Sequence, residues 1–147
     1  MASNIVCEEN VARHYGDNPD LLREYEKIAQ SGECPFCPAG IEKQGFSIVR
    51  ETPYWIAVKN QYPYANTALH LLLVPKRHII SFPELTGEEL AEWHRLMVVL
   101  TLDFPEGYGL ALRAGKVGGV ILYHLHWHLI VPEIGTDGQI SVNFGIG

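Results

Sequence analysis

The stretch "ILYHLHWHLIVP", residues 121–132, constrains the fold of this chain more than any other. Three histidines, His124, His126 and His128, alternate in it with apolar residues. In a β-strand every second side chain points to the same side, and neighbours on one side lie about 6.5 Å apart. We therefore expect one long strand whose apolar side, with Trp127, packs into a core. The other side would present three imidazoles to a polar space.

Three interpretations of these histidines are open. Incidental surface histidines are the first, and the apolar flanks of the stretch argue against them. A metal site is the second, because a His-x-His pair can place two imidazoles around one ion. A nucleophile with helpers is the third: a neutral imidazole attacks phosphorus, and a neighbouring histidine assists the leaving oxygen. The spacing alone does not separate the second from the third.

A glycine-rich turn directly precedes the predicted strand. In "RAGKVGG", residues 113–119, the glycines are Gly115, Gly118 and Gly119. Such a turn can direct successive backbone N–H groups at a phosphate. A plain turn between two antiparallel strands is the alternative. The turn and the histidines together favour a phosphate site.

A second constellation begins at "CPFC", where Cys34 and Cys37 have the spacing of a zinc knuckle. A thioredoxin-like redox pair would require a long helix starting at the motif. Here residues 38–40 are Pro-Ala-Gly and we expect a strand after them, which favours zinc. His78, at the end of "VPKRH", is a candidate third ligand, with a surface or capping role as its alternative. A histidine of the predicted strand would be the fourth.

Two helices are predicted by their capping residues. The helix over residues 19–30 has Asn18 at its N-cap and Gly32 at its exit. The second helix follows Thr86, because Thr86 and Glu89 form a capping box before apolar residues at helical spacing. An earlier helix is expected around residues 5–14.

The remaining elements are strands. "GFSIVR" and "PYWIAVKN" are short β-rich runs separated by residues 51–53, which predicts a hairpin. "ALHLLLVPKRH" is a buried strand that ends at Pro75, and "GYGLALRAG" is a further strand. The order of helices and strands predicts an α+β domain with one mostly antiparallel sheet.

Composition narrows the classes of function. The 147 residues are expected to form a single domain, 1–147, with residues 1–31 as an N-terminal helical extension. Eleven Lys and Arg face 17 Asp and Glu, for a net charge of −6, so we expect no nucleic-acid and no membrane partner. No signal-peptide pattern and no bilayer-length apolar run occur, and three cysteines do not make a disulfide scaffold. A cytoplasmic location is expected.

These motifs together resemble the histidine-triad (HIT) superfamily. "HLHWHLI" fits its signature of His-x-His-x-His followed by two apolar residues, and "LHLLLVPKRHIISFPEL" and "CPFCPAG" are similar to its strand-to-helix segment and its zinc knuckle. The resemblance runs from about Cys34 to Glu133. "CPFC" and "NQYPY" lean toward the galactose-1-phosphate uridylyltransferase and diadenosine-polyphosphate phosphorylase branches, although those transferases usually carry Gln where this chain has His128.

The resemblance implies a HIT-like fold, a homodimer and a set of residue roles. His126 would attack the α-phosphorus of a nucleotide, and His128 would contact the phosphate and the leaving group. His124 would orient the site or bind zinc. A structural Cys2His2 zinc site would use Cys34, Cys37, His78 and His124. The nucleotide would contact Phe46, Ile48, Asn60, Arg113, Gly118 and Gly119.

The chain departs from the family beside the triad. Arg113, Val120 and Ile121 stand where the family commonly has Asn, Gln and Ser, and Leu69 replaces a glycine. The usual polar pair is therefore apolar here, while Arg113 is a candidate for a bidentate phosphate contact.

The expected activity is that of a nucleotidyl hydrolase or transferase acting on a small nucleotide conjugate, such as a phosphoramidate or a dinucleoside polyphosphate. Two alternatives remain. One is a metal-dependent hydrolase that uses the histidines as ligands. The other is a non-catalytic nucleotide-binding module, suggested by Val120 and Ile121.

Overall fold

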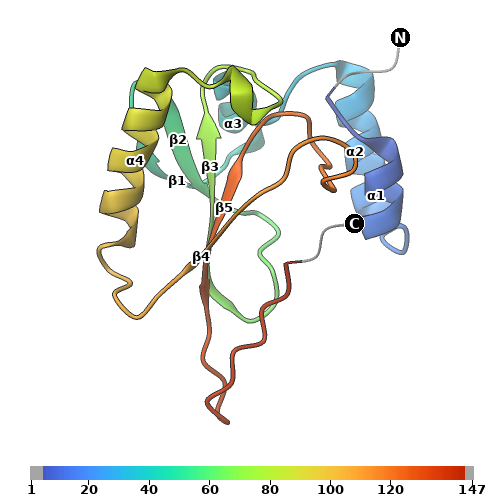
Figure 1. Ribbon diagram of the computed structural model, residues 1–147. Helices are drawn as coiled ribbons and strands as arrows, with labels where there is room; N and C mark the ends of the chain where they lie inside the picture. Colours follow the sequence, from blue (N-terminus) through green and yellow to red (C-terminus); the bar gives the residue numbers. More distant parts are fainter. Residues whose placement is uncertain (1–4, 145–147) are drawn as a thin grey trace.

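An antiparallel sheet of five strands forms the centre of the computed structural model, which describes residues 5–144 (Figure 1). Its spatial order is β1-β2-β3-β5-β4, and every neighbouring pair is antiparallel. The strands are β1 (Ile48–Glu51), β2 (Trp55–Lys59), β3 (Thr67–Pro75), β4 (Gly109–Leu112) and β5 (Trp127–Pro132). With the flanking helices this arrangement confirms the α+β fold and the hairpin expected from the sequence.

Helices cover the two faces of the sheet. Helix α4 (Gly87–Thr101) packs on one face, and α1 (Glu8–Tyr15), α2 (Pro19–Ser31) and α3 (Pro38–Gln44) lie on the other (Figure 1). Two apolar clusters result, because alternate residues of β2 and β3 point to opposite faces. One cluster joins Trp55, Leu73 and Met97, and the other joins Val58, Val74 and Val11.

The caps explain where the helices begin. The side chain of Asn18 accepts the Leu21 N–H, and Gly32 ends α2 with a φ of 70°, which a glycine adopts without strain. Thr86 and Glu89 form the expected capping box at α4. The first helix spans Glu8–Tyr15 and so starts three residues later than expected.

The last strand is shorter than the sequence pattern predicts. Regular pairing covers Trp127–Pro132 alone, so His124 and His126 precede β5 and the expectation of one strand carrying all three histidines is wrong. The reason is that β3 ends at Pro75, which has no N–H for a continued ladder. Leu125 donates instead to the carbonyl of Ile79.

A second expectation, that a strand follows residues 38–40 after "CPFC", is also wrong. The seven-residue helix α3 comes between the motif and β1. Pro38 at its first turn favours a helix start, and Gly45 ends it with a φ of 68°. Within residues 5–144 no helix is long and apolar enough to cross a bilayer.

Candidate functional site

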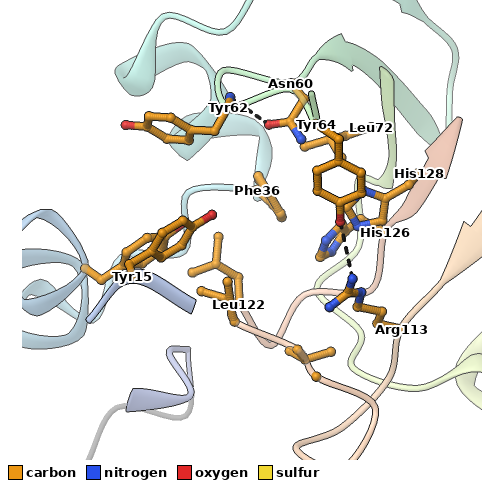
Figure 2. Close-up of a pocket in the computed structure, with 14 residues that line it drawn as sticks. Tyr15, Phe36, Asn60, Tyr62, Tyr64, Leu72, Arg113, Leu122, His126 and His128 are labelled. Carbon is orange, nitrogen blue, oxygen red and sulfur yellow. Dashed lines mark hydrogen bonds between the residues drawn. The ribbon is translucent and has the colours of Figure 1, made fainter. Parts of the chain in front are cut away.

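A cleft of about 580 Å³, including its open mouth, lies on the face of the sheet that carries α1, α2 and α3. His126 and His128 line one side of it beside Arg113 and Tyr64, and Tyr15 and Tyr62 lie on the opposite side (Figure 2).

His126 is held by its own neighbour in the chain. Its Nδ1 lies 2.7 Å from the carbonyl oxygen of His124, and a carbonyl can only accept, so Nδ1 carries the proton. The ring of Phe36 packs edge-on against the imidazole, with 4.9 Å between ring centroids. The proton on Nδ1 leaves the lone pair of a neutral His126 on Nε2. The residue therefore has the tautomer that a nitrogen nucleophile needs.

A relay of hydrogen bonds fixes the tautomer of His128. The backbone N–H of Tyr64 donates to Nδ1 of His70 at 3.1 Å, so the proton of a neutral His70 is on Nε2. That Nε2 lies 2.9 Å from Nδ1 of His128 and donates to it. A neutral His128 then carries its own proton on Nε2. His128 is thus a hydrogen-bond donor that lines the cleft.

Burial keeps these imidazoles uncharged. Burial, with a smaller contribution from the nearby His126, lowers the pKa of His70 to about 4 and that of His128 to about 2. Burial also lowers the pKa of His126; the hydrogen bond to the His124 carbonyl opposes this effect, and the positive charge of Arg113 adds to it. All three are neutral at physiological pH.

Arg113 brings positive charge to the cleft without a carboxylate partner in the described part of the chain. One guanidinium N–H donates to the hydroxyl of Tyr64 at 3.4 Å, and Nε is buried with no hydrogen-bond acceptor. The guanidinium carbon lies 4.3 Å from the centroid of the Phe144 ring. A half-buried arginine with no carboxylate partner in the described residues favours an anionic ligand.

Four side chains gather behind the cleft in a group suited to a metal ion. They come from the start of α3, the end of β3 and the segment before β5, and all four ligand atoms lie within 4.8 Å of one another: Cys34, Cys37, His78 and His124. Neighbouring ligand atoms are separated by 3.2–3.7 Å. The ligands of a tetrahedral zinc ion, with bonds of about 2.0–2.3 Å, are separated by roughly 3.3–3.8 Å.

The orientation of His124 matches a metal ligand. Its Nδ1 faces the two sulfurs, while Nε2 lies 2.8 Å from the carbonyl of Pro75 and donates to it. A carbonyl on the far nitrogen is the usual partner of a ligating histidine. His124 is buried within this group and does not line the cleft. The residues present fit zinc.

The HIT domain family model matches residues 43–134 of this sequence, from the end of α3 to just beyond β5. The chain belongs to the HIT domain family. A HIT-like protein from Chlamydia pneumoniae is 34% identical to this HIT protein over 87 residues, which are 56% of this chain and 77% of that one.

A second similarity reaches beyond the matched domain. AP-4-A phosphorylase from Mycobacterium tuberculosis (strain ATCC 25618 / H37Rv) is 34% identical over 148 aligned positions, covering 97% of this HIT protein and 69% of that enzyme. It therefore includes the region of α1 and α2.

Solved structures share the fold. A hypothetical histidine triad nucleotide-binding protein from Sulfolobus tokodaii strain 7 has a TM-score of 0.59 and 25% identity, covering 77% of this chain and 78% of that one. A Zn-bound histidine triad family protein from Mycobacterium smegmatis has a TM-score of 0.54 over 71% of this chain and 79% of its own. Its 19% identity shows the fold alone.

The residues expected from the sequence to bind the nucleotide do not all lie at the cleft. Asn60 lines it, and Phe46 lines an adjoining hollow that shares Asn60 and Phe36. Ile48 lies 49% exposed on the edge strand β1 and lines neither.

Gly118 and Gly119 are required by the backbone conformation of the turn. Gly119 lines the cleft, but its N–H donates to the Lys116 carbonyl, and its φ of 83° requires a glycine. A Cβ on Gly118 would meet the Ala114 carbonyl at 2.4 Å. This close approach of the backbone explains why residue 118 is a glycine. Gly118 itself does not line the cleft.

Three aromatic residues at or next to the cleft were not singled out in the sequence. Tyr64 stacks on His128, and Phe144 approaches the same imidazole from the C-terminal segment. Tyr15 reaches the cleft from α1. Tyr64 lies in the "NQYPY" run that pointed to two family branches, whereas Phe144 and Tyr15 depend on long-range packing.

Proposed function

We propose that this HIT protein cleaves a small nucleotide conjugate at its α-phosphorus through a nucleotidyl-His126 intermediate. The lone pair on Nε2 of His126 forms a bond to phosphorus while the bond from phosphorus to the leaving group breaks, and the leaving group departs with the electron pair of the broken bond. Water or phosphate then attacks phosphorus, the N–P bond breaks with its electron pair returning to Nε2, and the proton that an attacking water loses passes to the solvent or to the departed leaving group. Two easier displacements replace one difficult one.

One observation carries this proposal. The 2.7 Å hydrogen bond from Nδ1 to the His124 carbonyl puts the reactive lone pair of His126 on the nitrogen left for the cleft. The same bond accommodates the positive charge that the imidazole gains when phosphorus is attached. A histidine with a merely structural role would not require this tautomer.

Two further residues are suited to the charge of the substrate. His128 donates a hydrogen bond from Nε2–H to a phosphate or leaving-group oxygen, and it remains neutral as it does so. Arg113 neutralises phosphate charge in place of the polar pair that Val120 and Ile121 replace. The nucleoside extends toward Asn60 and Phe46, with the ribose nearer Asn60.

The similarity to AP-4-A phosphorylase supports a dinucleoside polyphosphate as substrate, and a nucleoside phosphoramidate is the other member of the expected class. With residues 1–31 included, residues 1–147 act as one domain. The partner is a small nucleotide, and a second copy of the chain completes a homodimer.

Zinc is the metal that we propose for the Cys34, Cys37, His78 and His124 group. Its chemistry there is structural, because four protein ligands close a tetrahedral site. It would join α3, the end of β3 and the segment before β5, and so fix the carbonyl of His124 on which His126 depends.

Intact-protein mass spectrometry tests the covalent step. Wild type and His126→Ala are mixed briefly with diadenosine tetraphosphate, adenosine phosphoramidate and a nucleotide sugar. We expect a nucleotide-sized mass gain on wild type alone, and a loss of turnover of at least about 10³-fold in the variant. The exposed His94 on α4 provides the matched control, since His94→Ala should retain the adduct.

Two other outcomes would identify the alternatives. A fully active His126→Ala would exclude the nucleophile. Turnover that chelation abolishes directly, with a metal bound by His126 and His128, would identify the metal-dependent hydrolase, although among residues 5–144 the ligands that come together are the Cys2His2 group without these two histidines. Mononucleotide binding without adduct or product would identify a binding module, the function that the apolar Val120 and Ile121 favour.

A further inference from the structure

The glycine turn beside the cleft depends on contacts from outside the matched domain. Gly119, Val120 and Ile121 form part of the cleft wall. The side chains of Val120 and Ile121 have no hydrogen-bonding groups, so they cannot anchor this wall to the rest of the protein by polar contacts. Within the turn, Gly119 donates to Lys116 and Val120 donates to Gly115.

Asn10 of α1 supplies the missing polar anchor. Its side chain is completely buried, and its Nδ2 donates to the Lys116 carbonyl at 3.0 Å and to the Val120 carbonyl at 2.7 Å. These two carbonyls bracket the turn. An amide oxygen in the same place would face two other oxygens, so the orientation of the amide follows from its partners.

Three additional contacts join the N-terminal segment to the same stretch. Cys7 donates its N–H to the Ile121 carbonyl at 2.8 Å, and Tyr123 donates to the Ile5 carbonyl at 2.7 Å. Glu9 forms an ion pair with Lys116. The polar link through Asn10 is the fully buried one among the side-chain contacts, and burial makes a lost partner costly.

We propose that Asn10 is a positioning residue that holds the glycine turn in its binding conformation, and that nucleotide affinity depends on it. The functional part of this inference rests on the proposed function. It assigns the N-terminal helix a direct role in shaping the phosphate end of the cleft, although α1 lies outside the family match at residues 43–134.

The test compares Asn10→Leu with wild type and with Glu8→Gln. Leucine keeps the branched shape of the asparagine side chain and removes both donated hydrogen bonds, whereas Glu8 is an exposed residue of the same helix. Binding of adenosine monophosphate is measured by calorimetry, and backbone amide exchange is followed by mass spectrometry, both well below the melting temperature of each variant.

We expect Asn10→Leu to weaken the affinity for adenosine monophosphate by about tenfold and to speed amide exchange at residues 116–120 by about tenfold. Exchange in α4 should be unchanged, and Glu8→Gln should match wild type. A folded Asn10→Leu with wild-type affinity and wild-type exchange would overturn the proposal, because Asn10 would then only fill space.

Two arms keep this inference separate from the proposed function. A wild-type chain that binds adenosine monophosphate but forms no adduct from the nucleotide conjugates would end the covalent mechanism and leave the role of Asn10 measurable. If Asn10→Leu does not fold, backbone amide exchange in the wild-type chain tests the positioning role instead. Amides of the turn should then open together with those of α1, and a turn that stays protected while α1 opens would refute the positioning role.

Discussion

At the scale of single residues, each reactive imidazole is set by the partner of its other nitrogen. The carbonyl of His124 selects the tautomer of His126, and His70 selects that of His128. The two roles differ because one partner is a fixed acceptor and the other a donor. His70 therefore matters to the cleft although it is a buried residue of β3.

The two buried histidines of this relay make stability depend on pH. Their pKa values, about 4 for His70 and about 2 for His128, lie below the 6.5 of an unfolded chain. The unfolded state therefore binds more protons as the pH falls below about 6.5, and the free energy of unfolding decreases from there toward pH 4. We expect His70→Gln, which removes one such group, to reduce this slope by up to about 1.4 kcal/mol per pH unit.

Urea unfolding at a series of pH values measures the slope. His94→Gln removes an imidazole that is exposed on α4, and it should follow the wild-type slope. Equal slopes for wild type and His70→Gln would mean that His70 is charged in the folded protein, and the tautomer relay to His128 would then be wrong.

At the scale of elements, the Cys2His2 group connects three segments that lie far apart in the sequence. The start of α3, the end of β3 and the segment before β5 meet there. We expect about one zinc per chain by metal analysis, and we expect Cys34→Ser to lose the metal together with several kcal/mol of unfolding free energy.

Cys7 gives the matched control for this experiment. It is buried at the start of α1 and lies outside the ligand group, so Cys7→Ala should keep one equivalent of zinc. A Cys34→Ser variant with full metal content and wild-type stability would contradict the structural zinc site.

The elements also show what the sequence can and cannot predict. Caps and periodicity predicted α2 and α4 because Asn18 and Thr86 act within one turn of the chain. The start of β5 was predicted too early because it depends on where β3 ends, at Pro75.

Some features of the candidate site were likewise predictable from the sequence, and others were not. The alternation of 124–129 correctly separated the histidines from Leu125, Trp127 and Leu129, which belong to the main core. The four metal-binding candidates come together as the motifs suggested. Asn10 and Phe144 could not be found from the sequence, because nothing near either residue in the chain indicates that it contacts residues 30 to 110 positions away.

At the scale of the whole molecule, one end of the sheet leaves apolar side chains in water. Val98 and Val99 of α4 are 48% and 40% exposed, Leu102 directly after this helix is 70% exposed, and Leu110 of the edge strand β4 is 40% exposed. The central strand β3 is paired on both sides, so β4 is the strand free to meet a second copy there. This surface is where we expect the homodimer.

Light scattering after gel filtration tests the homodimer. Wild type should have about twice the 16.5 kDa mass of one chain, and the double variant Val98→Glu, Leu102→Glu should have the mass of a monomer. Ile80→Glu, a change at a half-exposed residue away from α4, should leave the dimer intact. A monomeric wild type would refute the expectation.

The alternation in residues 124–129 also has a meaning in terms of information. Two kinds of constraint alternate along these six positions. Three positions require the chemistry of an imidazole, and the other three pack in the main core. Substitutions that either face tolerates are few, and both faces must be satisfied at once. A short segment with two such independent requirements rarely arises by chance. The seven residues "HLHWHLI" therefore identify the family of this chain better than its whole composition does.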